Sequence, residues 1–379
     1  MKTVKFGVVG CGLMGREFAS ASARWGHISA DIARPEIVAA ADVNPANTGW
    51  FEKNFASVRH VFTDYRKLLE LKEIEAVYAA VPHALHEKLY TDILKAGKHL
   101  IGEKPFGMDK AQNDVILAEV SKHPGLVVRC ASEFPYFPAM QMIIKWISEK
   151  RFGRILEIRC GFNHSSDIDP AKPINWKRQA AVNGEYGCMG DLGIHTQHVP
   201  FRMGFKPERV FAKLSKFVTE RPDGKGGVAP CDTWENATLI CDARDHGGNL
   251  FPMYMETKRM APGCTNDWFF EIYGTEGSAK FTTSNPNVLT YAVAWEKEQA
   301  WANINVGYKP MIPTITGPIF EFGFCDAILQ MWGAYMSELE GKSLFFPCFL
   351  PEETALSHRV FTAALQSHKT GSSVAIEGR

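Results

Sequence analysis

Short apolar runs alternate with helical patterns from the N-terminus to Ala131. This alternation predicts a parallel sheet flanked by helices, because parallel strands are joined by crossover connections that usually contain a helix. The apolar runs that we predict as strands are Val4–Val9, Ile37–Ala41, Ala76–Val81, His99–Gly102 and Leu126–Ala131. The periodic segments that we predict as helices are Gly15–Trp25, Asp64–Leu71, His86–Ala96 and Lys110–Lys122.

The pattern changes after Ala131. A helical segment at Pro138–Glu149 is followed by strand-like runs, and consecutive strands with short turns predict a mainly antiparallel sheet. These runs are Ile155–Phe162, Val210–Phe217, Thr233–Asp242, Gly248–Lys258, Trp268–Tyr273 and Ala279–Thr283. The span 284–318 is rich in Pro, Asn and Thr and is predicted as loop. Helical patterns return at Asp326–Leu339 and Pro351–Lys369.

Length and charge bound the number of domains and the kind of partner. A chain of 379 residues exceeds what one hydrophobic core usually serves, so we expect an α/β domain over 1–131 and an α+β domain over 132–379. Lys and Arg total 42, as do Asp and Glu, and the sequence has no basic tract. A small molecule is therefore the expected partner, and nucleic acid or an anionic membrane surface is not.

Cysteine usage and hydropathy bear on the cellular compartment. Nine cysteines are scattered from Cys11 to Cys348 without a C-x-x-C pair, which predicts neither a disulfide framework nor a zinc site. The first apolar run is too short for a signal-peptide core, and no stretch approaches the roughly 20 apolar residues of a membrane span. We therefore expect a cytoplasmic protein.

The hexapeptide Gly10-Cys11-Gly12-Leu13-Met14-Gly15 matches the G-x-G-x-x-G fingerprint of dinucleotide-binding sites. It follows a predicted strand and opens a predicted helix, which is the context that the fingerprint requires. The first glycine permits a sharp turn, the second lets the backbone approach a pyrophosphate, and the third allows helix and strand to pack closely. A turn with incidental glycines is the alternative, and the context favours a dinucleotide.

Asp42 stands at the end of the second predicted strand, where an acidic residue commonly binds the adenosine ribose hydroxyls. It comes later than the usual spacing, because extra residues around Trp25–Pro35 lengthen the connection before the strand. A carboxylate there would repel a 2′-phosphate, and the following segment Val43–Asn47 contains neither Arg nor Lys. NAD is therefore predicted in preference to NADP. An aspartate that only caps a turn is the alternative.

Lys104 lies in Glu103-Lys104-Pro105, just past the end of a predicted strand. In open α/β sheets this edge forms the ligand crevice, and the proline restricts Lys104 to extended geometry. An ammonium group beside a nicotinamide can hydrogen-bond a substrate hydroxyl or take part in proton transfer. A lysine on the surface is the alternative.

Asp191 and His195 are spaced i, i+4, which on a helix places both side chains on one face. Oxidation of an alcohol needs a base for the hydroxyl proton, and imidazole suits that role. An N-cap aspartate with a core histidine is the alternative, and His198 could line the same pocket or be structural. A metal site is not predicted, because the three residues do not have a recognised ligand spacing.

Taken together, these segments resemble the glucose–fructose oxidoreductase/inositol dehydrogenase (Gfo/Idh/MocA) family over nearly the whole chain. The most specific likeness is the order of Ala96-Gly97-Lys98-His99, Glu103-Lys104-Pro105 and Asp191-Leu192-Gly193-Ile194-His195. Further likeness lies in the glycine fingerprint, in Ala41–Pro45 and in Tyr273–Gly277. The sequence departs from the family at His83, where an asparagine is common, and at Glu185-Tyr186-Gly187, which replaces a glycine triplet.

The resemblance implies a Rossmann domain, then a domain with a large, mostly antiparallel open-faced sheet through which members form dimers or tetramers. It makes Lys104, Asp191 and His195 the catalytic set. Members of the family differ in whether the lysine or the histidine takes the proton. We favour His195 as the base, with Lys104 positioning the hydroxyl. The resemblance also implies cofactor contacts beyond the glycine loop and Asp42. These fall at Val81, Pro82, His83, His86, Glu103 and Lys104.

The segments flanking the catalytic pair supply candidate substrate contacts, which suit a ligand with apolar faces and a polar rim. They are His164, Trp176, Arg178, Tyr186 and His198. The leading hypothesis is an NAD-dependent dehydrogenase that oxidises a secondary hydroxyl of a sugar, glycoside or cyclitol. A glycosidase that retains NAD through oxidation, elimination and re-reduction is the alternative. A non-catalytic NAD sensor is a third hypothesis, which the presence of all three catalytic residues disfavours.

Overall fold

The computed structural model describes residues 2–293 and 298–377, which form two compact units. The first unit contains 1–107, 111–136 and 309–354, and the second contains 108–110, 137–308 and 355–379. Apart from 108–110, the chain leaves the first unit after Tyr136, close to the expected boundary after Ala131. It differs from the expectation in that 309–354 belongs to the first unit and not to the second.

The first unit is built on a six-stranded parallel sheet with the order β3-β2-β1-β4-β5-β6. This is the strand order of a dinucleotide-binding α/β fold, as the alternating pattern predicts. The strands are β1 (Thr3–Val9), β2 (Arg34–Ala41), β3 (His60–Phe62), β4 (Ala76–Ala79), β5 (His99–Gly102) and β6 (Val128–Cys130). The second and fourth strands are buried along nearly their whole length, which explains their continuous apolar runs.

Helices cover the sheet of the first unit. They are α1 (Leu13–Ala23), α2 (Pro45–Asn54), α3 (Tyr65–Leu69), α4 (His86–Lys95), α5 (Lys110–Val120) and α9 (Phe324–Leu339), with 3₁₀ turns η1 (Trp25–His27), η2 (His83–Leu85) and η3 (Phe134–Tyr136). In α9, Trp332 packs on Phe18 of α1 and on Phe6 of β1. This aromatic contact explains why 309–354 returns to the first unit, since burying such rings is strongly favourable.

The second unit contains a nine-stranded sheet with the order β16-β15-β14-β13-β7-β12-β11-β8-β17. Only β7 and β12 pair in parallel among these described strands, so the prediction of a mostly antiparallel sheet is confirmed. The strands are β7 (Ile155–Asn163), β8 (Lys206–Ser215), β11 (Asn236–Arg244), β12 (Leu250–Lys258), β13 (Asp267–Gly274), β14 (Gly277–Thr282), β15 (Val288–Val293), β16 (Ala302–Asn305) and β17 (Val374–Ala375). A separate hairpin is formed by β9 (Glu220–Pro222) and β10 (Val228–Pro230).

The prediction of a loop over 284–318 is wrong for part of its length. Val288–Val293 and Ala302–Asn305 form β15 and β16 at one edge of the sheet. Both strands are largely exposed, so neither shows the strong apolar alternation of a strand with one buried face. Residues 294–297, which the loop prediction also covered, lie outside the described residues.

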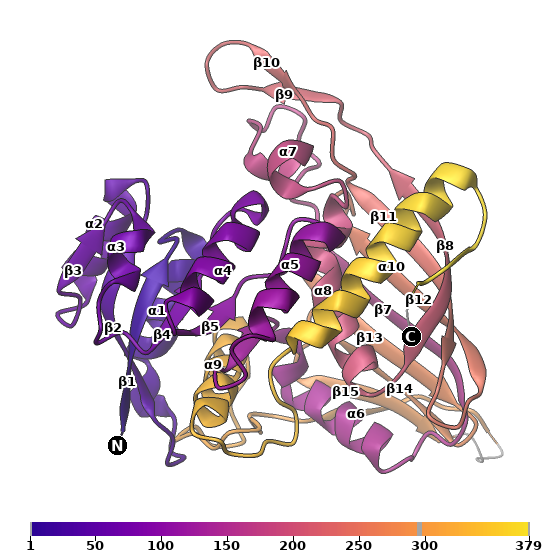
Figure 1. Cartoon of the computed structure of the whole chain (residues 1–379). Coiled ribbons are helices and arrows are strands. Elements are labelled where there is room, and N and C mark those ends of the chain that lie inside the picture. The colour runs from indigo at the N-terminus through magenta and orange to yellow at the C-terminus, as the bar shows by residue number, and fades with distance from the viewer. Residues whose placement is uncertain (1, 294–297, 378–379) are drawn as a thin grey trace. The chain divides into compact units, whose positions relative to one another are not determined.

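One face of the large sheet is covered by helices (Figure 1). The helices of this unit are α6 (Pro138–Ser148), α7 (Ala180–Asn183), α8 (Cys188–Arg202) and α10 (Pro351–Thr370), with the 3₁₀ turn η4 (Trp176–Arg178). Strand β12 alternates between buried and part-exposed positions, and α8 packs on β7, β11, β12 and β13. The central helix α8 is therefore buried from Cys188 to Phe201. Within the described ranges, no helix is both long enough and apolar enough to cross a membrane.

Candidate active site

The carboxyl ends of four parallel strands meet at one edge of the sheet in the first unit. Val9 at the end of β1 is in register with Ala41 of β2 and with Ala79 of β4, and Ala79 is in register with Gly102 of β5. The segments that follow these strands carry the glycine loop, Asp42, Val81–His86 and Glu103-Lys104. The sheet therefore brings the predicted cofactor residues to the edge where open α/β sheets bind ligands.

The glycine loop has the shape that a bound pyrophosphate requires. Gly10 has φ 89°, and a Cβ at this position would lie 2.1 Å from the carbonyl oxygen of Ala80. At Gly12, by contrast, a Cβ would meet no atom of the described residues within 4 Å, so space for a ligand lies over the backbone. Gly12 also precedes α1, whose first turn has no side-chain cap at this position. A helix N-terminus of this kind attracts phosphate, so the loop fits a dinucleotide.

Of the other residues in the glycine loop, one is exposed to solvent and two pack into the core. Leu13 is 75% exposed, and Met14 packs partly against the core of the first unit. The Cys11 side chain is buried, and burial raises the pKa of its thiol to about 12, so Cys11 contributes backbone and not thiolate chemistry.

Asp42 is held in a defined orientation by three donors. The Cys11 backbone N–H donates to Oδ2 at 2.8 Å, and the Asn47 amide donates to the same oxygen at 3.2 Å. The Asn44 backbone N–H donates to Oδ1 at 2.8 Å. Asp42 therefore links the glycine loop to the end of β2, which is more than a turn cap requires. Its place and charge fit the ribose contact predicted for NAD.

The segment after β4 is largely buried. His83 lies in η2 with little exposed surface. His86 donates from Nε2 to the Val81 carbonyl oxygen at 3.0 Å, and its Nδ1 accepts the Gly107 backbone N–H at 3.4 Å. His86 thus connects this segment to the loop after β5. The cofactor contacts of Val81, Pro82, His83 and His86 stay predictions.

Glu103 anchors the loop that carries Lys104. Its Oε1 accepts the Tyr78 hydroxyl at 2.8 Å, and its carbonyl oxygen accepts the Tyr90 hydroxyl at 2.8 Å. Glu103 is buried, whereas Lys104 is partly exposed. The two tyrosines therefore fix the backbone directly before Lys104, which supports a defined direction for its side chain.

In the second unit, α8 places Asp191 and His195 on one face, as their spacing predicts. Asp191 is only 1% exposed and forms ion pairs with Lys177 of η4, 3.1 Å from its Oδ1, and with Arg259, which directly follows β12. The His195 ring lies edge-on to Phe162 with 5.6 Å between ring centroids, and the Trp268 indole N–H donates to the His195 carbonyl oxygen at 2.9 Å. The Asp191 side chain is thus held by η4 and by the residue after β12, and His195 contacts β7 through its ring and β13 through its backbone.

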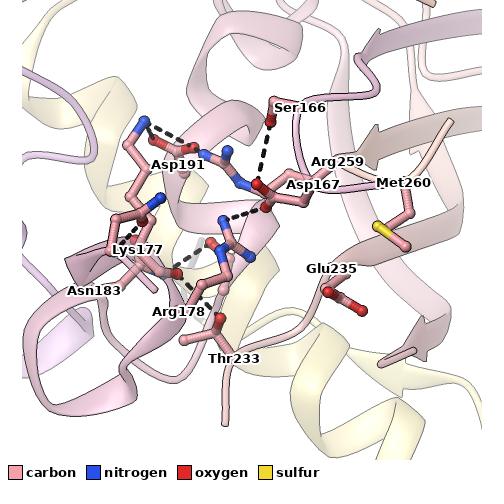
Figure 2. Close-up of polar contacts among 12 residues, drawn as sticks. Ser166, Asp167, Lys177, Arg178, Asn183, Asp191, Thr233, Glu235, Arg259 and Met260 are labelled. Carbon is pink, nitrogen blue, oxygen red and sulfur yellow. Dashed lines mark hydrogen bonds and ion pairs between the residues drawn. The ribbon is translucent and has the colours of Figure 1, made fainter. Parts of the chain in front are cut away.

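A cavity of about 520 Å³ opens beside these ion pairs. Figure 2 shows Arg259 lying between Asp191 and Asp167, with Lys177 directed at Asp191. This volume lies within the range of small-molecule sites, roughly 300–1,000 Å³. The cavity is lined by His164, Ser166, Asp167, Lys172, Asn175, Trp176, Lys177, Arg259, Thr265 and Asn266.

Asp167 is the carboxylate at the floor of this cavity. Its Oδ2 lies 2.9 Å from the Arg178 guanidinium, and its Oδ1 lies 3.3 Å from the Lys172 ammonium. Burial alone would raise the pKa of Asp167, but Arg178, Arg259 and Lys172 outweigh burial and hold it below its usual 3.8. Asp167 is therefore ionised at neutral pH.

His164 lies at the end of β7 and lines the same cavity. Burial, and next the positive charge of Arg259, lower the pKa of His164 to about 3, so its ring is neutral at physiological pH. Its Nδ1 accepts the Ser166 backbone N–H at 3.4 Å, which assigns the ring proton to Nε2. His164 is therefore a neutral hydrogen-bond donor, suited to a ligand oxygen.

The five candidate substrate residues have separate places in the structure. His164 and Trp176 line the cavity, and Arg178 lies beneath it on Asp167. The Tyr186 hydroxyl bonds to Thr362 of α10 at 2.7 Å, and His198 is fully buried in α8. The structure thus supports a substrate contact for the first two and a packing role for the last two.

Sequence reasoning missed four charged residues of the site, which are Asp167, Lys172, Lys177 and Arg259. Lys177 and Arg259 bind Asp191, and Asp167 orients two cations. Lys177 has a usable signal in the sequence, since it stands between Trp176 and Arg178, which are both candidate substrate contacts. Arg259 and Asp167 lie at or beyond strand ends, and only the fold brings them to α8. In the described parts of the chain, no group of three or more His, Cys, Asp or Glu side chains is arranged to hold a metal ion.

Comparison with known families and proteins agrees with this geometry. The model of the oxidoreductase family with an NAD-binding Rossmann fold matches residues 4–129, and the model of the GFO/IDH/MocA C-terminal domain matches residues 140–280. The first unit therefore contains an NAD-binding Rossmann domain, and the prediction of NAD as the cofactor is confirmed.

Individual relatives cover most of the chain. Levoglucosan dehydrogenase from Pseudarthrobacter phenanthrenivorans is 28% identical over 338 residues, which are 85% of this chain and 83% of that protein. D-apiose dehydrogenase from Paraburkholderia graminis is 23% identical over 79% of this chain and 78% of that protein. Among solved structures, levoglucosan dehydrogenase in complex with NADH and L-sorbose matches with a TM-score of 0.90 at 24% identity, over 100% of both chains. The last similarity confirms the fold.

Replacing Asp42 with Ala is expected to weaken NAD binding about tenfold or more, because a charge-assisted hydrogen bond to the ribose is lost. The dissociation constants of NAD and NADP, measured by fluorescence titration, check this expectation. Asp42→Asn is the matched control, because an amide oxygen can still accept from Cys11 while the negative charge is gone. Asp42→Asn should reduce the ratio of NAD affinity to NADP affinity, because the charge that repels a 2′-phosphate is gone. An unchanged NAD affinity in Asp42→Ala would show that Asp42 does not bind the ribose.

Proposed function

Since the chain belongs to the Gfo/Idh/MocA family of oxidoreductases, we propose that it is an NAD-dependent dehydrogenase that oxidises a secondary hydroxyl of a sugar, glycoside or cyclitol. The observation that carries the proposal is the donor-rich cavity next to Asp191 in the second unit. The sugar dehydrogenases named above among the relatives support the same substrate class.

We propose separate roles for the three residues of the catalytic set. NAD, when bound by the glycine loop and Asp42, supplies a hydride acceptor at nicotinamide C4. His195 takes the proton of the hydroxyl that is oxidised, so that the carbonyl forms as the carbon loses hydride. Lys104 donates a hydrogen bond that orients this hydroxyl.

Asp191 has the third role in this proposal. Arg259 and Lys177 hold its carboxylate in place, so it can accept a hydrogen bond from a second substrate hydroxyl in a fixed direction. The neutral Nε2–H of His164 and the indole of Trp176 line the neighbouring cavity, where a sugar ring finds a donor and an aromatic face. This arrangement favours a polyhydroxylated substrate over an apolar one.

NADH formation tests the function directly. Free sugars, glycosides and inositols are incubated with the protein and NAD, and separately with NADP, while absorbance at the nicotinamide band is followed. At least one sugar or cyclitol should give net NADH, with NAD more effective than NADP. Release of sugar from a glycoside without net NADH would instead indicate the glycosidase that retains its cofactor. Neither reaction with any compound would contradict the proposal.

Replacing His195 with Ala should lower kcat about 100-fold or more, because general base catalysis contributes about that much. His246→Ala is a suitable control, since His246 is exposed and is not among the residues that line the cavity. Both variants are compared with the parent by steady-state kinetics, and circular dichroism verifies their fold. Full turnover in folded His195→Ala would assign the base to another residue.

We further propose a cytoplasmic homodimer or homotetramer assembled through the open face of the large sheet. All nine cysteines are free, which supports a reducing compartment. On the open face, Phe211 of β8 pairs with Ile240 of β11, and they are 42% and 43% exposed.

Light scattering should give a mass of two or four times the 42.3 kDa of one chain. Phe211→Arg combined with Ile240→Arg should shift the protein toward monomer, because burying unpaired charge in an interface is unfavourable. Phe217→Arg serves as the control, since Phe217 is exposed outside the sheet. A monomeric parent protein at micromolar concentration would contradict this assembly.

A further inference from the structure

Cations outnumber carboxylates around the cavity of the second unit. Three of the lining residues are cationic and one is a carboxylate, and two further charged residues, Arg178 and Asp191, are ion-paired to these. The group contains four cations and two carboxylates, which are Lys172, Lys177, Arg178 and Arg259 with Asp167 and Asp191. With His164 neutral, the cavity carries two positive charges in excess.

The excess of positive charge does not come only from the solvent-exposed lysines, because two buried arginines contribute to it. Arg178 and Arg259 are both nearly fully buried. Arg178 pairs with Asp167, and Arg259 pairs with Asp191 and also acts electrostatically on Asp167. Burial, and next the positive charge of Arg178, lower the pKa of Arg259, which is the direction expected where positive charges crowd together. Buried positive charge without matching negative charge is destabilising, so an anionic group in the cavity would be stabilising.

A second buried ion pair, which does not line the cavity, lies nearby in the same unit. Arg221 and Glu235 are both 1% exposed and lie 3.9 Å apart, and the Arg221 guanidinium also donates to the Asp167 and Asp169 carbonyl oxygens. This pair has one cation for one carboxylate. Arg221 and Glu235 both lie close enough to act on Arg178, but because they carry opposite charges, counting them with the cavity leaves the excess at two.

Hydrogen-bond donors that could bind an oxyanion line the cavity. Lys172 and Lys177 are 41% and 33% exposed, so both ammonium groups are accessible to a ligand from solvent. The side chains of Asn175, Thr265 and Asn266 line the same space and can donate hydrogen bonds. Two ammonium groups with neutral donors around them are a common arrangement for an oxyanion.

We propose that this cavity binds an oxyanion substituent, a carboxylate or a phosphate, on the sugar that the protein oxidises. The inference rests on the proposed function and narrows its substrate class from sugars in general to acidic sugars. Lys172 and Lys177 contact the oxyanion, and Arg259 supplies positive charge from beneath. Lys172 sets specificity, while Lys177 also holds Asp191.

Matched sets of compounds test this inference with the full protein and NAD. Each set contains a neutral sugar, its uronate and its 6-phosphate, with glucose and galactose as the two parents. At least one acidic member should have a kcat/KM about tenfold or more above its neutral parent, since a charge-assisted contact contributes about that factor. The uronate and phosphate arms distinguish the two oxyanions.

Three lysine variants test whether Lys172 causes the preference for acidic over neutral sugars. Lys172→Met should reduce the ratio of acidic to neutral kcat/KM severalfold, and Lys172→Arg should retain most of it because the charge is kept. Lys225→Met is the matched control, since Lys225 is exposed in the turn between β9 and β10 and should leave the ratio unchanged. Thermal melting verifies that all three variants fold.

Binding measurements separate the two hypotheses. Calorimetry with NADH present measures the affinity of each compound without turnover. Neutral parents that react as well as their acids, or a ratio that is unchanged in Lys172→Met, would overturn the oxyanion site while the dehydrogenase stands. If neither these sets nor the wider panel of sugars, glycosides and inositols yields NADH, the proposed function fails, and binding of uronate or phosphate that depends on Lys172 would still support the site. Absence of such binding would overturn it.

Discussion

Burial of the Asp191 carboxylate is the constraint on which the geometry of the second unit's site depends. A carboxylate removed from water is strongly destabilising unless cations and hydrogen-bond donors surround it. Arg259 and Lys177 meet this need. Arg259 follows β12, which is far from α8 in the chain, and Lys177 comes from η4, in the segment that precedes α8. The pairing therefore fixes helix, sheet and connecting segment in one arrangement, and the cavity takes its shape from that arrangement.

The same cations that stabilise the fold also define what the cavity can bind. Lys177 pairs with Asp191 and lines the cavity, and Asp167 orients Lys172 and Arg178 at its floor. Ligand sites are commonly apolar with a few polar groups, whereas this one is formed largely by charged and hydrogen-bonding side chains. Such a surface suits a ligand that has oxygens on every side. Rigid ion pairs also keep donors in place before a substrate arrives, which favours catalysis.

Strands that bury most of their side chains could be predicted from the sequence, because burial requires a run of apolar residues. Exposed elements lack this pattern. The strands β1, β2, β4 and β5 are largely buried, and their apolar runs were visible in the sequence. Strands β15 and β16 lie at a sheet edge with few residues buried, and their sequence predicts a loop. Helix α2 was also missed, because its sequence mixes Gly, Asn and aromatic residues, although Asn44 before Pro45 is a recognisable helix start.

The sequence by itself determined the fold class and the cofactor half of the protein. Each motif of that half directly follows a strand, so a parallel sheet in register necessarily brings the motifs to one edge. Only the tertiary structure decided which side chains surround Asp191, and that the segment carrying α9 belongs to the first unit. The physical reason is that ion pairing and aromatic packing join residues far apart in the chain, whereas strand periodicity and glycine turns are local properties.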